Sequence, residues 1–198
     1  MAYVSCAAQL AADIAQNCDT PLVGGYTGLG VLIPADNVEF VTDGTNPRKI
    51  KSITKYDDVF IVDNVNATPF TGSSTAGNSD SGYPAYLKTI AVRVPMRGAD
   101  SSKNVVEALF NSPSGFVGVF AKKDKVGDGS FEVIGAQSAM VGDISSLTRD
   151  ESANGGAWSL NLTCTESWAE VTLVGDNDTY SSAKQAWDGL IAAARARS

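Results

Sequence analysis

The chain of 198 residues contains no histidine, the side chain that most often serves as an acid, a base or a metal ligand near neutral pH. A serine or cysteine nucleophile activated by histidine is excluded for the same reason. The three cysteines, Cys6, Cys18 and Cys164, are odd in number and have no CxxC spacing. They indicate reduced thiols rather than a disulfide framework.

Nucleotide and metal motifs are also missing. No glycine-rich stretch ends in Gly-Lys followed by Ser or Thr, and the glycines of residues 24–30 precede a predicted strand, which reverses the dinucleotide-binding order. The stretch Asp176-Asn177-Asp178 lacks the later glycine and acidic residue of a calcium loop, because Ser181 and Trp187 stand at those places. We therefore predict that the protein is not an enzyme and needs no cofactor and no metal.

Long hydrophobic runs and an excess of positive charge are missing too. No run approaches the roughly 18 apolar residues of a membrane-spanning helix, and Met1–Leu10 has no basic stretch typical of a secretion signal. We expect synthesis in the cytosol and no membrane partner. The formal net charge of −7 argues against tight binding to nucleic acid, which needs Lys and Arg to neutralise phosphates.

Turn-forming residues are abundant, with 19 glycines together with many Ser, Thr, Asn and Asp residues, and this composition favours many short strands. Alternation of apolar and polar residues, or short apolar runs, predicts ten strands. They are 29–33, 38–42, 49–55, 58–63, 87–96, 116–122, 131–135, 143–148, 157–164 and 168–174. We expect 49–55 to be an exposed or edge strand, and 58–63 to be covered on both faces because residues 59–62 form a continuous apolar run.

Three short helices complete the prediction. The first spans residues 5–17, where Cys6, Leu10 and Ile14 share one face, and the second spans residues 101–110. The third begins at Ser181 or Ser182 and ends at about Arg195. The sequence thus predicts a single domain over residues 1–198 with a mainly β (α+β) fold: an antiparallel β-barrel or sandwich with N-terminal, middle and C-terminal helices.

A long polar segment interrupts the pattern at about residues 68–86. Residues 71–82 contain no side chain able to anchor a core, so we predict a structureless loop or arm, a feature that is usually functional in a small domain. Its deletion is expected to leave the fold intact. Its candidate contact residues are Thr71, Gly72, Gly77, Asn78, Asp80, Gly82 and Tyr83.

Two blocks of the sequence resemble virion structural proteins of phages of Bacteroidetes-type hosts, and in particular tail tube proteins. The first is the Ala-rich segment ending at residues 15–19, followed by Gly24-Gly25. The second holds residues 131–135, 140–141 and 148–150, a Gly155-Gly156 turn, residues 157–162, then Glu166 and residues 168–171. The second block departs from the family at Ala139-Met140, where the glycine after the first late strand is often followed by Gly-Leu or Gly-Met.

The resemblance implies a structural subunit that assembles into hexameric rings stacked into a phage tail tube. The genome, double-stranded DNA, would pass through the lumen without specific binding. Repulsion between the acidic protein and the DNA phosphates would lower the friction on the moving DNA. The polar loop would contact the next ring. Further partners would be other tail proteins, such as the tape measure, terminator and baseplate or hub proteins, and the location would be the tail of the virion.

Two alternatives remain open at this stage. One is another virion role, namely a head–tail joining, tail terminator or head decoration protein, which would share the β-rich fold. The other is a carbohydrate- or peptide-binding β-sandwich in which Tyr83, Tyr86 and Tyr180 form aromatic platforms.

Overall fold

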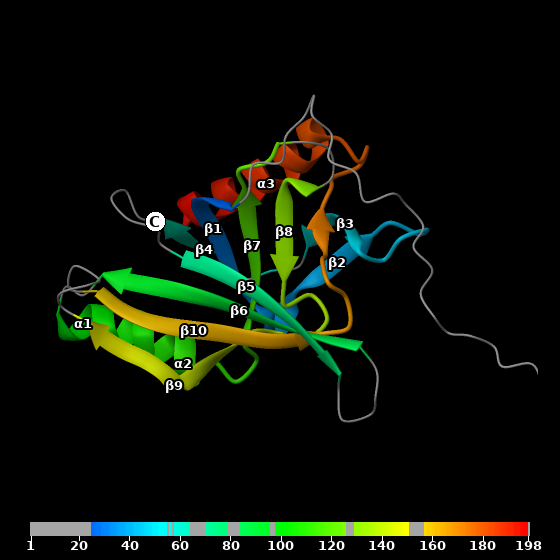
Figure 1. The fold of residues 1–198 in the computed structure, drawn as a ribbon. Helices are drawn as coiled ribbons and strands as arrows, with labels where there is room; N and C mark the ends of the chain where they lie inside the picture. The colour runs from blue at the N-terminus through cyan, green and yellow to red at the C-terminus, as the bar shows by residue number, and fades with distance from the viewer. Residues whose placement is uncertain are drawn as a thin grey trace, which may run out of the picture.

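The computed structural model describes residues 25–54, 56, 58–63, 70–78, 84–95, 98–125, 129–150 and 157–197. Two sheets dominate this part of the chain (Figure 1). The larger sheet has the order β2 (Glu39–Thr42), β3 (Lys49–Thr54), β11 (Thr172–Leu173), β8 (Phe131–Ile134), β7 (Phe116–Lys122), β1 (Tyr26–Pro34) and β4 (Phe60–Asp63). The smaller sheet has the order β5 (Phe70–Asn78), β6 (Pro84–Pro95), β10 (Ala157–Glu166) and β9 (Val141–Asp150).

The expectation of a mainly β fold is confirmed, and its barrel form is wrong. Neighbouring strands pair antiparallel, except that β11 runs parallel to β3, and in the described residues neither sheet closes on itself. The two sheets instead pack face to face. Buried side chains from both, including Leu32, Phe70, Ile90, Phe120 and Leu160, form a continuous apolar core between them.

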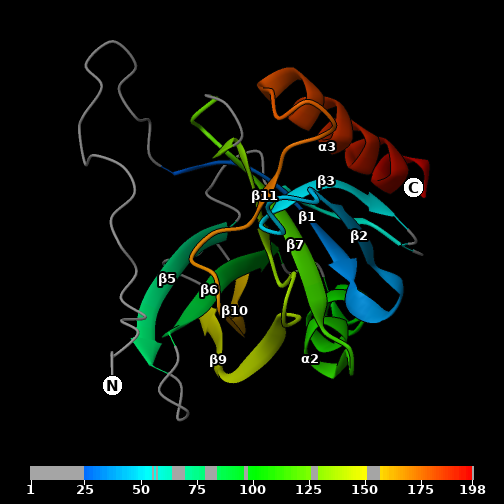
Figure 2. The same ribbon diagram turned by 90° about the vertical axis from the view of Figure 1, so that its right-hand side faces the viewer.

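A second core lies on the opposite face of the larger sheet, beneath the helix α3 (Tyr180–Ala196). Figure 2 shows α3 on one side of this sheet and the smaller sheet on the other. Along β1, Val31 and Ile33 point to the helix while Leu32 points between the sheets. Because both faces are covered, the central strands have continuous apolar sequences rather than an alternating pattern.

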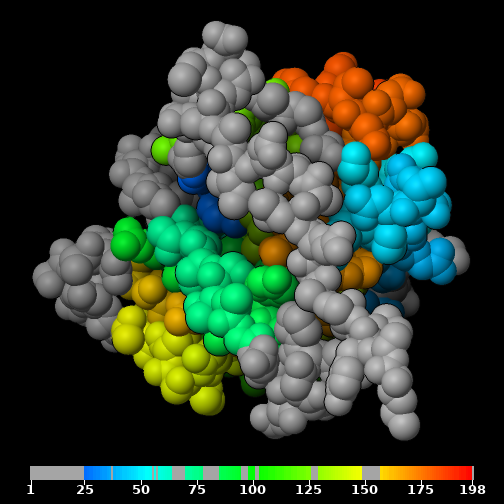
Figure 3. Space-filling view, turned by 45° about the vertical axis from the view of Figure 1, so that its right-hand side comes forward, coloured from blue at the N-terminus to red at the C-terminus, as the bar shows by residue number. Residues whose placement is uncertain are grey.

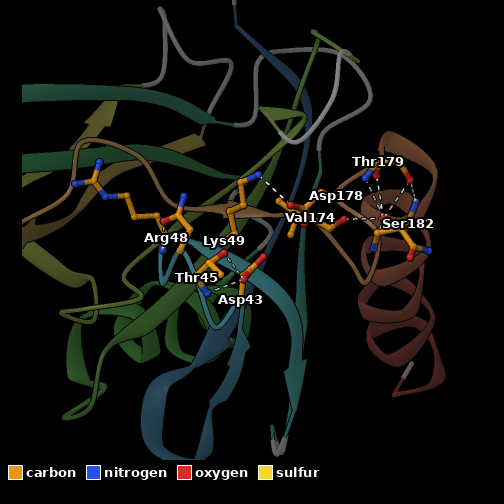
Figure 4. Close-up of polar contacts among 10 residues, drawn as sticks. Asp43, Thr45, Arg48, Lys49, Val174, Asp178, Thr179 and Ser182 are labelled. Carbon is orange, nitrogen blue, oxygen red and sulfur yellow. Dashed lines mark hydrogen bonds and ion pairs between the residues drawn. The ribbon is translucent and has the colours of Figure 1, made fainter. Parts of the chain in front are cut away.

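The helix α3 begins as the sequence predicts, except that the capping residue is Thr179. Its side-chain oxygen accepts a hydrogen bond from the backbone N–H of Ser182, and the Ser182 hydroxyl in turn accepts one from the backbone N–H of Thr179 (Figure 4). Gly175 is required just before it, because its φ is +68° and a Cβ atom there would lie 2.4 Å from the backbone of Ser182. The Asp176–Asp178 stretch is thus a turn leading into a capped helix.

The predicted middle helix is confirmed as a segment of three parts: α1 (Ala99–Ser101), the π-helical η2 (Ser102–Glu107) and α2 (Ala108–Asn111). Its buried residues Val106 and Leu109 join the core between the sheets. Phe110 packs against Gly142 of β9, where a Cβ atom would lie 2.6 Å from its ring. The predicted helix over residues 5–17 lies outside the described residues. A single-turn 3₁₀ helix, η1 (Ala35–Asn37), joins β1 to β2.

Three predicted strands differ from the structure in their neighbours, their burial or their length. β3 is not an edge strand: it lies between β2 and β11, and its Ile50 and Ile53 are buried. β4 is not covered on both faces, since it ends the larger sheet and exposes Ile61. The strand expected over residues 168–174 is reduced to the two residues of β11. The spacing of apolar residues along a strand shows which of its side chains are buried, but not which other strands pair with it.

The predicted polar loop is wrong over residues 70–78 and 84–86, which belong to β5 and β6. Strand β5 pairs with β6 at nine successive positions, from Phe70 opposite Val92 to Asn78 opposite Pro84. Backbone hydrogen bonds hold this hairpin, and its Ser, Thr and Gly side chains give no hydrophobic signal. Deleting residues 71–82 would therefore remove a strand of the smaller sheet, so the expectation that the fold survives this deletion is withdrawn.

Candidate functional site

Four strands carry open edges in the described part of the chain: β2 and β4 in the larger sheet, β5 and β9 in the smaller. An open edge can pair with another chain, and proteins usually guard it by shortness, charge or a bulge. β2 and β4 have four residues each, β2 begins with Glu39, and β4 ends with Asp63. These two edges are short and charged, so they are poor sites for strand addition.

The edge of β9 is interrupted by a bulge. Its pairing with β10 shifts between Asp143 and Thr148, and the Asp143 carboxylate closes a local turn by accepting hydrogen bonds from the Ser145 backbone N–H at 3.0 Å and hydroxyl at 2.7 Å. The Ser146 hydroxyl then accepts the backbone N–H of Asn161 at 2.8 Å, in place of a backbone carbonyl. The bulge prevents regular pairing along this edge and leaves Ile144 80% exposed.

The edge of β5 has none of these guards. It runs for nine residues, pairs with β6 without a register shift, and contains neither a charged residue nor a proline. Residues 71–77 are all exposed, and Figure 3 shows β5 at the surface of the molecule. Among the described residues, β5 is the one of the four edges that combines length, regular register and no charge, which suits it to accept a neighbouring strand.

The first part of β5 is fixed firmly to the larger sheet. The Phe70 ring packs against Phe120 and Tyr26, with centroid separations of 4.7 and 5.4 Å. Gly72 lies directly over Tyr26, and a Cβ atom at this position would be 2.7 Å from the tyrosine ring. A larger side chain at residue 72 would therefore push β5 away from its support.

Tyr26 is held in place by charged neighbours. Its hydroxyl donates a hydrogen bond to Glu132 Oε2 at 2.9 Å, and Lys122 Nζ lies 3.6 Å from the same oxygen. Burial, followed by the Glu132 charge, raises the pKa of Tyr26 far above its usual value. Burial alone would lower the pKa of Lys122, but its pairing with Glu170 and Glu132 raises it. Tyr26 thus remains a neutral hydrogen-bond donor beneath β5.

The smaller sheet presents one face away from the larger sheet, which we call the outer face. The strand registers assign to it residues 71, 73, 75 and 77 of β5, residues 85, 87, 89, 91 and 93 of β6, and residues 159, 161, 163 and 165 of β10. Its side chains are mainly hydroxyls, small groups and one amide, with Leu87 and Arg93 as exceptions. Because α2 contacts β9 and α3 contacts the larger sheet, no described helix covers the outer face.

The contact residues predicted from the sequence are partly brought together. Thr71, Gly72, Gly77 and Asn78 all lie on β5, along the unguarded edge. Asp80, Gly82 and Tyr83 lie outside the described residues. Sequence reasoning placed the segment correctly as an exposed element but missed that it is a strand. The available signal was the regular alternation of Thr71, Ser73 and Thr75, since threonine favours strands.

A groove of about 650 Å³ lies between β4, β6 and the middle helix. Its lining is mostly apolar, and Ile61 and Val105 are exposed within it. Arg197 lies at one side, with its guanidinium carbon 4.0 Å from the centre of the Phe60 ring. One of its terminal guanidinium nitrogens lies 3.5 Å from Asp58 Oδ2. Sequence reasoning missed this groove, because its walls come from distant segments.

The aromatic residues proposed as platforms do not gather at one site. Tyr86 lies on β6, whereas Tyr180 begins α3 and stacks on Phe131 at 6.2 Å beyond the larger sheet. Tyr83 lies outside the described residues. Two tryptophans are half-buried: Trp158 packs against the core between the sheets, and Trp168 against the core under α3, where Arg48 lies 5.8 Å from its ring.

Within the described residues, no group of three or more Cys, Asp or Glu side chains is placed to hold a metal ion. The same part of the chain has no helix that is both long and apolar enough to cross a membrane. Comparisons with family models, with curated proteins and with solved structures find no match to this chain.

Proposed function

We propose that the protein is a structural subunit of a phage tail tube, which assembles through strand addition at β5 into hexameric rings that stack. The observation that carries the proposal is the nine-residue edge of β5, which is exposed, regular and uncharged. Monomeric proteins guard such edges, because unguarded ones recruit other chains. A protein that keeps one open is suited to bind copies of itself.

The firm attachment of β5 supports this proposal. A strand that recruits a neighbour must keep its shape when free, since ordering it on contact would reduce the affinity. The Phe70, Tyr26 and Phe120 rings fix one end of β5 to the larger sheet, and pairing with β6 fixes its whole length. The edge is thus prepared for pairing before any partner arrives.

The outer face of the smaller sheet is our candidate for the lumen surface. Hydroxyl and amide groups are uncharged and form no ion pairs with phosphates, so with Arg93 as the one cation among the residues assigned to this face, DNA would slide over it without being held tightly. The acidic balance of the chain, at −7, acts in the same direction. A strand added at β5 by a segment of the neighbouring subunit would extend this polar face toward the next subunit of the ring.

Electron microscopy of the purified protein tests the proposal directly. We expect rings and stacked tubes whose class averages show one subunit repeated around a central channel. A preparation that stays monomeric at high concentration, with no rings or tubes, would overturn the proposal. Rings that never stack would instead identify a joining or terminator protein, the runner-up within the virion.

The orientation of the outer face can be tested in assembled tubes. Thr163 on β10 belongs to the outer face, whereas Lys184 is exposed on α3. In tubes, Thr163→Cys should react with a small maleimide but not with one attached to a bulky polymer, while Lys184→Cys should react with both. Equal labelling by the bulky reagent at the two positions would refute a lumen position for this face. The unsubstituted protein corrects for its own cysteines.

Peptide binding is the second candidate function, and the apolar groove between β4, β6 and the middle helix favours it. A peptide with apolar anchors would fit its walls, and the groove lies beside the open edge of β4. Saturable binding of a peptide that is lost in Ile61→Asp, together with the absence of rings, would favour this function over a tube subunit.

A further inference from the structure

A charged pair is buried inside the molecule, at one end of the core between the sheets. Lys88 of β6 and Glu166 of β10 are 1% and 2% exposed, and Lys88 Nζ lies 2.5 Å from Glu166 Oε2. The register places Lys88 opposite Cys164, so Glu166 is its diagonal neighbour on the same face. Two adjacent strands thus direct a primary amine and a carboxyl group into the same water-excluded corner.

The two oxygens of the Glu166 carboxyl group have different surroundings. Oε1 accepts hydrogen bonds from the backbone N–H groups of Gly135 at 3.0 Å and Gln137 at 3.2 Å. Oε2 faces the Lys88 amine. Two backbone donors on one oxygen are the arrangement that stabilises negative charge on a carbonyl oxygen during acyl transfer. One oxygen of the carboxyl group therefore has two backbone donors, and the other is in contact with a primary amine.

The contact between Lys88 and Glu166 differs from an ordinary salt bridge. Although the two atoms are 2.5 Å apart, neither Lys88 Nζ nor Glu166 Oε2 takes part in a hydrogen bond of normal geometry. Buried ion pairs lose hydration energy that good hydrogen bonds must replace. Here the amine touches one carboxyl oxygen without a well-formed hydrogen bond, so that only the other oxygen, Oε1, is compensated by backbone donors.

We propose that Lys88 and Glu166 condense to form an intramolecular isopeptide bond between β6 and β10. The ammonium group first gives a proton to the carboxylate, which yields a neutral amine and a neutral acid. The nitrogen lone pair then attacks the carboxyl carbon, and the negative charge on Oε1 is held by the N–H groups of Gly135 and Gln137. The nitrogen proton passes to Oε2, the C–Oε2 bond breaks, and water leaves. An ammonium and a carboxylate thus become one amide and one water molecule, with no further reactant.

The product fits the site better than the ion pair does. Two buried charges are replaced by a neutral amide, so the cost of desolvating them disappears. The amide oxygen retains both backbone donors. The bond would join two neighbouring strands of the smaller sheet within one chain, and it does not depend on the proposed tube function.

Mass spectrometry of the full chain tests the proposal. We expect the denatured protein to be lighter than its sequence by one water molecule, after allowance for removal of Met1. Trypsin does not cleave after an acylated lysine, so residues 56–93 should appear joined to residues 150–184. Folded wild-type protein with the full sequence mass after prolonged incubation would overturn the proposal.

Two controls make the result specific. Lys88→Arg keeps the positive charge, but its guanidinium stays protonated and does not condense, so this variant should have the full sequence mass. The half-exposed pair of Lys49 and Asp178, 3.0 Å apart, should give unlinked peptides from the wild-type digest. Loss of water that persists in Lys88→Arg would place the bond elsewhere and refute the assignment. The wild-type measurement decides the question even if Lys88→Arg does not fold.

Discussion

Lysines introduced on β5 should separate assembly from folding. The register places Ser74 and Ala76 on the face of β5 that points toward the larger sheet, yet both are exposed in the isolated chain. A neighbour added at β5 would bring its own core against this face. We therefore predict that the double variant Ser74→Lys/Ala76→Lys folds normally but does not assemble.

The magnitude follows from the length of the edge. In an antiparallel pair, alternate residues of the nine in β5 present their N–H and C=O groups to the new strand, which gives about eight hydrogen bonds worth about 1 kcal/mol each in net terms. Burying an ammonium group costs several kcal/mol. Burying the two lysine ammonium groups therefore offsets at least about half of the free energy gained from the hydrogen bonds. A loss of about 4 kcal/mol raises the concentration needed for assembly roughly a thousandfold.

Sedimentation of the protein over a range of concentrations measures this shift. The matched control is Ser73→Lys/Thr75→Lys, which places the same two charges on the outer, solvated face of the same strand. The control should assemble at a concentration close to that of the wild type. If the Ser74→Lys/Ala76→Lys variant assembles as readily as the wild type, β5 is not the contact strand.

Three further predictions concern the stability of the folded chain. Gly72→Val should lower the free energy of unfolding in urea by about 1–3 kcal/mol, because its Cβ atom would lie 2.7 Å from the Tyr26 ring, whereas Gly77→Val, with open space around it, should change it little. Trp187→Ala should cost about 3–5 kcal/mol in the same assay, since this side chain is 5% exposed in the core under α3, and a loss below about 1 kcal/mol would contradict that packing. Burial, followed by a neighbouring carboxylate, raises the pKa of Cys164 from 9.0 to about 12, so its contribution is complete below pH 9 and is lost as the pH rises toward 12. Stability should therefore fall across this window in the wild type and less steeply in Cys164→Ala.

The sequence predicts where most strands lie because burial leaves a pattern in the chain. Residues 31–33 and 116–121 are continuous apolar runs, and the structure buries their side chains alternately under α3 and between the sheets. The observed N-cap of α3, Thr179, lies two or three residues before the predicted Ser181 or Ser182. All three side chains can accept a backbone hydrogen bond, so the sequence does not distinguish them. Local chemistry is sufficient for such features.

Neighbour relations could not be predicted in the same way. β3 becomes an internal strand only because the two-residue β11, more than 120 positions later, pairs parallel to it through Thr172 and Leu173. β5 has almost no hydrophobic signal, because its backbone rather than its side chains holds it in the sheet. The sequence did contain a signal for the buried pair. Lys88 and Glu166 both stand at inward-facing positions of strands whose other inward-facing residues are mainly apolar. A charge at such a position must find a partner.

The larger sheet covers only part of the inward face of the smaller sheet, and both the buried pair and the open edge lie where this cover ends. Its inward face is covered by the larger sheet as far as Lys88, and the side chains opposite and beyond it on β5, Ser74 and Ala76, are exposed. If those positions were large and apolar, free subunits would aggregate before they could assemble in order. Small side chains avoid this, and in the proposed tube the backbone of β5 would then supply the attraction between subunits. Attraction of this kind requires a strand that does not deform, and a covalent bond from Lys88 to Glu166 would hold the sheet behind β5 in its paired register.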